Sequence, residues 1–252
     1  MSLPVNIGAV VLAAGKGARL HCGDRPKVLC EIGGQPIVAY TAATLARLGF
    51  TPDRLVLVVG FQHEKVREHF SDRVGYAHQT EQLGTAHAAF TGMRALPPEV
   101  AEVLVMGGDD SAFYKAESLE RLVAEHLRSG ALVTVLTAEF DTPPLICRVI
   151  RDAAGNCVAL REKEHLSAAE QKTIKEINTG TYCLNRAWFE KLFPTMQPLV
   201  GLGEYGLNTV VEVAVAAGSR VNAVKLENPQ EWFGVNTPEE LAEADRRKRM
   251  AN

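Results

Sequence analysis

The run Ile7 to Leu12 (IGAVVL), followed by Ala13 to Gly17 (AAGKG), decides the fold. The first six residues are short, continuous and apolar, which is typical of a strand buried on both faces of a parallel sheet. The glycines that follow break the strand. Because open α/β sheets bind ligands beyond the carboxyl ends of their strands, this loop is the first candidate for a binding site.

The rest of the first half repeats this alternation of buried strands and helices. Strands are predicted at 54–59, 74–78, 102–106 and 132–137, and helices at 36–48, 62–70, 85–96 and 117–128. This rhythm predicts an α/β fold with a doubly wound, mostly parallel sheet. The second half of the chain does not continue this regular alternation. It predicts a hairpin within 147–160, strands at 176–184 and 220–226, and helices at 186–192, 209–217 and 238–250.

Composition narrows the classes of protein. A chain of 252 residues with 46% hydrophobic content can form one large α/β domain, and a net charge of −3 gives no overall attraction to nucleic acid or an acidic membrane. Five cysteines without a C-x-x-C pair indicate neither a disulfide framework nor a zinc site, so reduced thiols in the cytoplasm are expected. The longest apolar run is too short to span a bilayer, and no basic region precedes it as in a signal peptide.

The first loop has the character of a phosphate-binding loop. Glycines after a buried strand let backbone N–H groups approach a phosphate, and Arg19 and Lys27 add positive charge. The pattern is neither a Rossmann fingerprint nor a Walker A loop. A tight glycine turn with solvated basic residues is the alternative.

A second candidate is the acidic pair Asp109 and Asp110, which follows the predicted strand at 102–106. A carboxylate there would face the crevice and could hold Mg²⁺ against phosphates. Asp110 could do the same work or could cap the next element, and the residue pattern leaves both open.

Three further segments carry polar groups beside glycines. The stretch 79–86 (QTEQLGTA) enters a helix, which suits close approach of a base or a phosphate, although an N-cap at Thr85 is by itself the more common case. The stretch 176–180 (EINTG) has a glycine inside a strand, which marks either a ligand or a β-bulge. At 234–239 (GVNTPE), Thr237 and Glu240 form a capping box, which leaves Asn236 as a candidate ligand.

Together these segments resemble the sugar-1-phosphate nucleotidyltransferases of the nucleoside-triphosphate transferase superfamily. The runs 12–19 (LAAGKGAR) and 26–29 (PKVL) resemble the signature loop of that family. The runs 81–85 (EQLGT), 176–180 (EINTG), 203–205 (GEY) and 234–236 (GVN) resemble, in order, motifs of the bacterial N-acetylglucosamine-1-phosphate uridylyltransferases. The resemblance spans roughly residues 7 to 245.

The resemblance implies a Rossmann-like nucleotidyltransferase fold with a small β-rich acceptor lobe, and it implies a role for each matching residue. Arg19 and Lys27 would be catalytic, and Asp109 and Asn236 would bind Mg²⁺. The nucleotide would contact Leu12, Ala13, Ala14, Gly15, Lys16, Gly17, Gln79, Gln82, Gly84 and Thr85. The acceptor would contact Gly108, Glu162, Asn178, Gly180 and Tyr205, with Lys163 competing for the place of Glu162.

The implied protein is one nucleotidyltransferase domain over 1–252. Its nucleotide-binding half covers about 1–140, its acceptor-binding half about 141–235, and its C-terminal helix about 238–250. No hexapeptide repeat follows, so an acetyltransferase β-helix domain is not expected. The departures from the family lie on the acceptor side, where 145–148 (LICR) replaces Gly-Tyr-Gly-Arg and 206–209 (GLNT) replaces Tyr-x-Thr-Asp.

The predicted function is Mg²⁺-dependent transfer of a uridylyl group from UTP to a sugar 1-phosphate, N-acetylglucosamine 1-phosphate first, with release of pyrophosphate. Small-molecule substrates are the expected partners, without nucleic acid or membrane, and a homo-oligomer is left open. One rival is a nucleotidyltransferase for another phosphorylated acceptor. A second is a non-catalytic regulatory protein that binds nucleotide sugars. A glycosyltransferase is disfavoured because Asp109 and Asp110 lack the Asp-x-Asp spacing.

Overall fold

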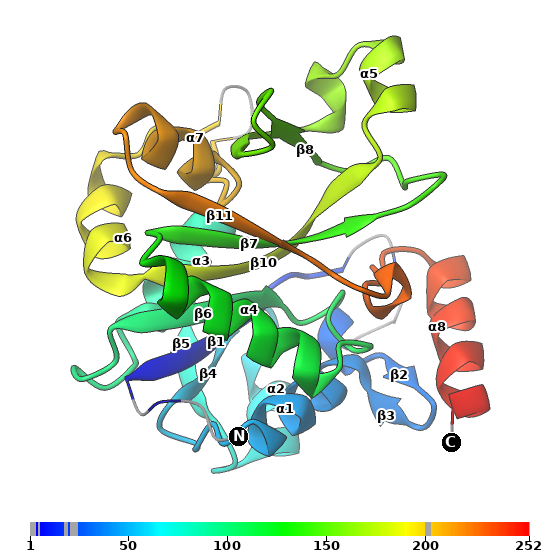
Figure 1. Cartoon of the computed structure of the whole chain (residues 1–252). Helices are drawn as coiled ribbons and strands as arrows, with labels where there is room; N and C mark the ends of the chain where they lie inside the picture. Colours follow the sequence, from blue (N-terminus) through cyan, green and yellow to red (C-terminus); the bar gives the residue numbers. More distant parts are fainter. Residues whose placement is uncertain (1–3, 5, 18–19, 21–24, 200–202, 252) are drawn as a thin grey trace.

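The computed structural model describes residues 4, 6–17, 20, 25–199 and 203–251. Within these ranges the chain forms one large twisted sheet with helices on both faces (Figure 1). The strands are β1 (Ile7–Ala13), β4 (Leu55–Val59), β5 (Gly75–His78), β6 (Glu102–Gly107), β7 (Val133–Glu139), β8 (Arg148–Arg151), β9 (Cys157–Arg161), β10 (Glu176–Asn185) and β11 (Val221–Lys225). The predicted α/β class is therefore confirmed.

The helices lie close to their predicted positions. They are α1 (Ile37–Arg47), α2 (His63–Phe70), α3 (Thr85–Met93), α4 (Ala116–Ser129), α5 (Ala168–Thr173), α6 (Arg186–Leu192), α7 (Thr209–Ala216) and α8 (Pro238–Ala251). Short 3-10 turns are η2 (Lys27–Leu29), η3 (Lys163–His165), η4 (Phe193–Thr195) and η5 (Pro229–Glu231). A small hairpin of β2 (Glu31–Ile32) and β3 (Gln35–Pro36), not predicted, precedes α1.

The first strand, β1, shows why helices pack on both faces of the sheet. Val11 packs into a core with side chains of α1, α2 and α4, whereas its neighbour Val10 packs into a second core with side chains of α3, α6 and α7. Because successive side chains of a strand point to opposite faces, a continuous apolar run requires helices on both sides. β1 is central, and it pairs in parallel with β4 and β6.

The strand order of the large sheet is β11-β7-β10-β6-β1-β4-β5. β10 lies between β6 and β7 and is antiparallel to both, while β11 runs parallel to β7. The strands β10 and β11, predicted as part of the acceptor half, thus belong to the central sheet. The β8–β9 hairpin joins it through β10 and projects from it with α5 (Figure 1).

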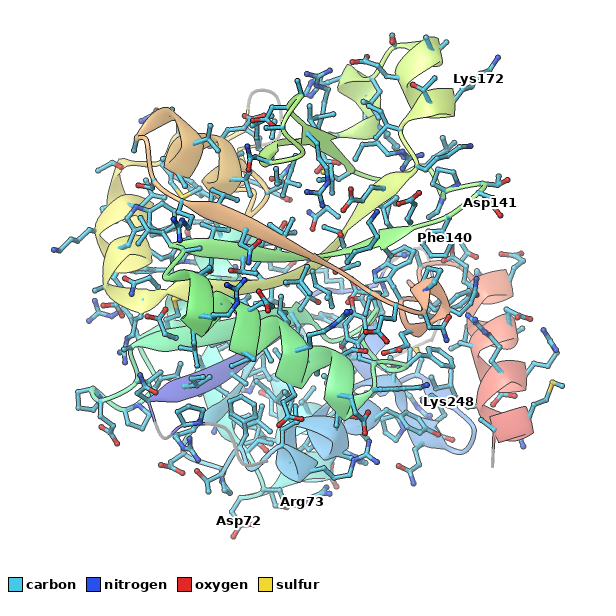
Figure 2. All side chains as sticks on the ribbon, viewed as in Figure 1. Asp72, Arg73, Phe140, Asp141, Lys172 and Lys248 are labelled. Carbon is cyan, nitrogen blue, oxygen red and sulfur yellow. The ribbon has the colours of Figure 1, made fainter. Side chains whose placement is uncertain are left out.

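The C-terminal helix is fixed to the loop that follows β6. Lys248, labelled in Figure 2, extends from α8 and donates a hydrogen bond to the carbonyl oxygen of Ala112 (2.7 Å). Its ammonium lies over the rings of Tyr40 (4.0 Å) and Phe113 (4.4 Å), where aromatic faces attract a cation. Burial lowers the pKa of Lys248 to about 8. The helix therefore supports the segment that carries the acidic pair.

No helix in the described part of the chain is long and apolar enough to traverse a bilayer. Cys147, Cys157 and Cys183 are free thiols, as expected. The expectation is wrong at Cys30, which is disulfide-bonded, because spacing along a sequence does not report the distance between thiols in the fold.

Candidate active site

A cavity of about 620 Å³ opens where β1 and β6 end, which is the edge predicted for the site. Pockets of this size accommodate small-molecule ligands. Its lining includes predicted nucleotide residues Leu12, Ala14, Gly15, Gly17, Gln79, Gln82, Gly84 and Thr85, predicted catalytic or metal residues Lys27 and Asp109, and predicted acceptor residues Glu162, Asn178, Gly180 and Tyr205.

The first loop presents an open backbone to this cavity. Chain neighbours aside, no atom of the described residues lies within 4 Å of where a Cβ on Gly15 would stand, so a ligand can approach the main chain there. Gln82 donates to the carbonyl oxygen of Ala14 (3.1 Å) and links the loop to the segment before α3. Ala13 is buried and Lys16 is exposed, and neither lines the cavity. Arg19 lies outside the described residues.

Lys27 joins three distant segments at the floor of the cavity. Its ammonium donates to the carboxylate of Asp109, after β6, and to Oδ1 of Asn236 (2.8 Å), which precedes α8. The Lys27 side chain is 12% exposed and that of Asp109 is 28% exposed. Gly17 packs against the lysine stem, since a Cβ there would stand 2.5 Å from the Lys27 Cβ. Both predicted metal residues are therefore hydrogen-bonded to Lys27, although Asn236 itself does not line the cavity.

The pair Asp109 and Asn236 fits a divalent metal by chemistry. Their carboxylate and amide oxygens already converge on one cation, the ammonium of Lys27. Oxygen ligands of this type suit Mg²⁺, which commonly takes only one or two protein ligands and fills the remainder with water and phosphate oxygens. Among the residues that the structure describes, no cluster of three or more His, Cys, Asp or Glu side chains could hold a metal.

Asp110 is a second carboxyl that lines the cavity. Its Oδ1 is closed to solvent and has no hydrogen-bond partner among the described residues, and its Oδ2 faces Gly180. Burial, and then the charge of Asp109, raises the pKa of Asp110 well above its usual value. A capping role for Asp110 is absent from the observed contacts, because the N-cap of the next helix, α4, is Lys115.

The segment before α3 is shaped by contacts within the chain. Gln79 Nε2 donates to the carbonyl oxygen of Gly84 (3.1 Å) and contacts Nδ1 of His87 (3.0 Å). The N-cap of α3 is Gly84, and Thr85 is the first residue of the helix. The Oγ1 of Thr85 accepts a hydrogen bond from the amide of Leu207 (2.9 Å). The N-cap alternative for Thr85 is therefore wrong, and its side chain anchors the loop that precedes α7.

Gly84 is required by close backbone packing as well as by conformation. Its φ is +94°, and a Cβ there would stand 2.7 Å from the carbonyl oxygen of Tyr205. Leu83 and Ala86 hydrogen-bond the Tyr205 backbone on either side (both 2.8 Å). The GEY segment is thus docked directly on the helix entrance.

We expect Gly84→Ala to destabilise the fold by more than the roughly 1 kcal/mol of a positive-φ glycine replacement. The reason is that the new methyl group would push Tyr205 out of the cavity wall. Thermal unfolding measures the effect. Gly130→Ala is the matched control, because Gly130 also has a positive φ (+61°) but has open space at its Cβ. Equal losses in both variants would contradict the packing argument.

Two hydrogen-bonded pairs of polar side chains line the cavity among the predicted acceptor residues. Asn208 Nδ2 donates to Oε1 of Glu162 (2.7 Å), and Asn178 Nδ2 donates to the hydroxyl of Tyr182 (2.6 Å). Burial, and then the charge of Glu164, raises the pKa of Glu162. Lys163 is half exposed, contacts Glu164 and does not line the cavity, so geometry favours Glu162 over Lys163.

The glycine within β10 forms the β-bulge that the sequence left as an alternative. Pairing with β7 shifts register between Asn178 and Tyr182, and Gly180 has a φ of +77°. The Gly180 amide donates to Oδ1 of Asn178 (3.0 Å), which fixes that side chain toward the cavity. A bulge that aims a side chain is a recurring feature beside binding sites. The two interpretations of this glycine are therefore compatible.

Some residues fall differently from prediction. Gly108 does not line the cavity: its amide donates to the carbonyl oxygen of Leu12 (3.0 Å), and it packs behind the wall. Sequence reasoning missed Tyr182 and Asn208, which both line the cavity. The only sequence signal for Asn208 was the departure at 206–209, and for Tyr182 it was its place two residues after Gly180. The capping box of Thr237 and Glu240 is confirmed.

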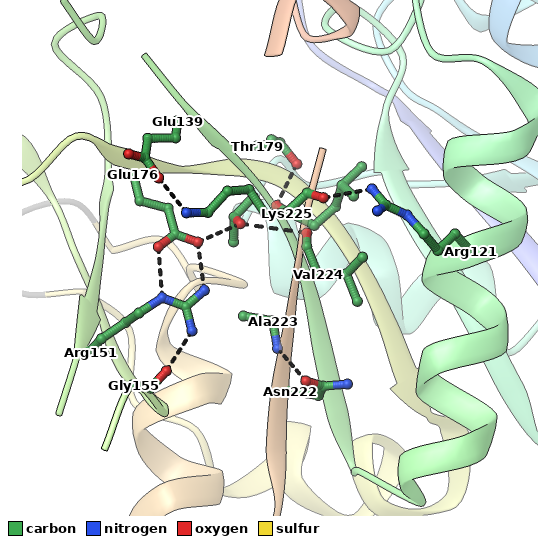
Figure 3. A network of polar contacts seen from close by, with 12 residues as sticks. Arg121, Glu139, Arg151, Gly155, Glu176, Thr179, Asn222, Ala223, Val224 and Lys225 are labelled. Carbon is green, nitrogen blue, oxygen red and sulfur yellow. Dashed lines mark hydrogen bonds and ion pairs between the residues drawn. The ribbon is translucent and has the colours of Figure 1, made fainter. Parts of the chain in front are cut away.

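A polar network behind the acceptor side ties the hairpin to the central sheet (Figure 3). Glu176 of β10 accepts from Nε (2.7 Å) and Nη2 (2.6 Å) of Arg151, and from the hydroxyl of Thr137 (2.6 Å). Burial alone would raise the pKa of Glu176, but the hydrogen bonds from Arg151 and Thr137 lower it overall. The network holds β8 against β10 close to Asn178.

Residues 9–176 match the family described as MobA-like NTP transferase domain. Among curated relatives, "Bifunctional protein GlmU" of Heliobacterium modesticaldum is 40% identical over 237 residues, covering 94% of this chain and 51% of the relative. "Bifunctional protein GlmU" of Desulfotalea psychrophila is 34% identical over 245 residues, covering 97% of this chain and 71% of the relative. The chain spans about half the length of the first of these relatives.

Two solved structures share the fold. One is described as a putative glucose-1-phosphate thymidylyltransferase from Bacillus anthracis in complex with a sucrose, with a TM-score of 0.80 at 18% identity over 98% of this chain and 96% of that one. The other is HddC from Yersinia pseudotuberculosis complexed with GMP-PN, with a TM-score of 0.71 at 19% identity over 95% and 98%. At these identities the likeness extends to architecture alone.

Proposed function

The chain belongs to the MobA-like NTP transferase family, and from this premise we propose that it transfers a uridylyl group from UTP to a sugar 1-phosphate in a Mg²⁺-dependent reaction. N-acetylglucosamine 1-phosphate is the favoured acceptor, and pyrophosphate leaves. The relatives named GlmU support this proposal, as do the motifs that the chain shares with uridylyltransferases. We further propose that residues 1–252 act as one unit, in the cytoplasm, where the three free thiols would stay reduced.

The observation that carries the proposal is the contact of Lys27 with Asp109 and Asn236 at the floor of the cavity. The same cavity is also lined by Gly15 and Gly17 of the first loop and by Glu162 and Asn178. One cavity therefore offers groups for phosphates, for a divalent ion and for a polyhydroxylated acceptor. An ion pair with a purely structural role would not need to lie in a cavity lined by these groups.

The chemistry follows from positioning and charge. An oxygen of the acceptor phosphate attacks the α-phosphorus of UTP, a new P–O bond forms, and the bond to the bridging oxygen breaks as pyrophosphate departs. The acceptor phosphate is already ionised, so no strong general base is needed. Lys27 would neutralise charge on the triphosphate, and the backbone N–H groups around Gly15 would donate hydrogen bonds to its oxygens. Mg²⁺ held by Asp109 and Asn236 would supply further charge neutralisation.

We expect Glu162→Gln to raise the KM for the sugar 1-phosphate by roughly 10-fold or more while the KM for UTP stays unchanged. The physical reason is that a hydrogen bond to a charged group contributes about 1.5–3 kcal/mol. Steady-state kinetics with each substrate varied in turn provides the measurement. Lys163→Gln is the adjacent control and should change neither constant, because Lys163 does not line the cavity. A higher KM for UTP alone would move Glu162 out of the acceptor site.

The direct test is pyrophosphate release with a panel of nucleoside triphosphates and sugar 1-phosphates, with and without Mg²⁺. We expect release with UTP and N-acetylglucosamine 1-phosphate, and loss of it on chelation. Release with another acceptor only would support the first rival. Binding of a nucleotide sugar without turnover of any pair would support the regulatory protein and overturn the proposal.

A further inference from the structure

The ammonium of Lys27 occupies the place that a metal would need. Its two acceptors are the carboxylate of Asp109 and the amide oxygen of Asn236, the same two atoms that fit a divalent ion. A Mg²⁺ ion held by both oxygens would need the space now filled by the ammonium. Lysine and metal therefore compete for one position.

The lysine is built to stay in this position while the cavity is empty. Pro26 fixes the backbone immediately before Lys27. The aliphatic stem of Lys27 packs over Gly17. Its side chain is only 12% exposed, so an ammonium displaced within the site would lose both its partners with little water at hand to replace them. Displacement by a bare metal ion would also bring two cations close together in a site with little water.

A nucleoside triphosphate changes this balance, because it brings anionic oxygens to the loop above Lys27. The ammonium can then exchange Asp109 for phosphate, and the vacated oxygens can bind the ion. We propose that Lys27 excludes the divalent metal from Asp109 and Asn236 until a nucleoside triphosphate draws its ammonium away. This inference rests on the proposed function. It predicts that the metal binds at Asp109 and Asn236 only together with the nucleoside triphosphate.

The test is a titration with Mn²⁺ alone, in which the free ion is followed by electron paramagnetic resonance. We expect Lys27→Met to bind Mn²⁺ at least 10-fold more tightly than the wild type, because the Asp109 carboxylate loses its internal counterion. Lys27→Arg, which keeps the charge, should bind as weakly as the wild type. The double variant Lys27→Met with Asp109→Asn should lose the gain, which locates the ion.

Two results would overturn the inference: a Lys27→Met variant that binds Mn²⁺ no better than the wild type, or a gain that persists in the double variant. Circular dichroism checks the fold of each variant.

Crystals of the wild type decide the question without any variant. Soaked in Mn²⁺ alone, they should show Lys27 in place and no anomalous peak beside Asp109. Soaked in Mn²⁺ with UTP, they should show a peak there and Lys27 on the phosphates. A peak in the absence of UTP overturns the inference alone, whereas no peak with UTP bound overturns the metal role in the proposed function.

Discussion

Asp109→Asn should lower the rate of pyrophosphate release by roughly 10²–10³-fold, the range seen when one preorganised charge-stabilising group is removed from a transition state. The amide keeps the shape and one oxygen of the carboxylate but loses the charge that pairs with Lys27 and that the proposed metal would need. Rates at saturating UTP and acceptor, with Mg²⁺ varied, provide the measurement. Part of the loss should be recovered at high Mg²⁺, because the amide still offers one ligand oxygen.

The matched control is Asp141→Asn, which removes an exposed carboxylate after β7, away from the cavity (Figure 2). It should leave the rate within twofold of the wild type. An Asp109→Asn enzyme that is folded and fully active would remove this residue from the chemistry.

The second large effect is on stability. Glu176→Gln should lower the free energy of unfolding by about 2–3 kcal/mol, since it leaves Arg151 without its charged partner in a largely buried setting. For a chain of this size the midpoint of thermal unfolding should fall by roughly 5–10 °C. Chemical denaturation gives the free energy directly. Glu139→Gln, which breaks the exposed pair with Lys225 in the same network, should cost less than about 1 kcal/mol (Figure 3).

The Glu176→Gln variant also tests how the stability of the fold depends on pH. Because the native network lowers the pKa of Glu176, its contribution to stability is complete above the unfolded pKa of about 4.3 and is lost as the pH falls through the native value. The difference in stability between wild type and Glu176→Gln should therefore be constant near neutrality and shrink in acid. A difference that grows on acidification would contradict the assignment.

The strands that carry the site are readable from the sequence, because buried parallel strands are continuous apolar runs that end at glycines. The ends of β1 and β6 were located this way, and they meet at one edge of the sheet. The direction of β10 was not readable. A strand buried between two neighbours is apolar whether it runs parallel or antiparallel, and its partners β6 and β7 are remote in sequence.

Some residues of the candidate site could likewise be predicted from the sequence, and others could not. Lys27 and Asp109 could be singled out because they follow a glycine loop and a strand end. Asn208 and Tyr182 could not, since their places depend on hydrogen bonds across the fold, to Glu162 and Asn178. Gly84 was singled out as a place where a ligand could approach, and it does line the cavity, but the backbone of Tyr205 packed against it could not be predicted from the sequence.

The central position of β10 has a consequence for synthesis of the chain. The strands β1, β4, β5 and β6 can associate as they leave the ribosome, because each pairs with another of this early group. β6 and β7 do not pair with each other, so both keep an open edge until residues 176–185 emerge between them. Exposed edges of apolar strands are prone to intermolecular pairing. The nascent protein is thus most vulnerable to aggregation after β7 is made and before β10 closes the sheet.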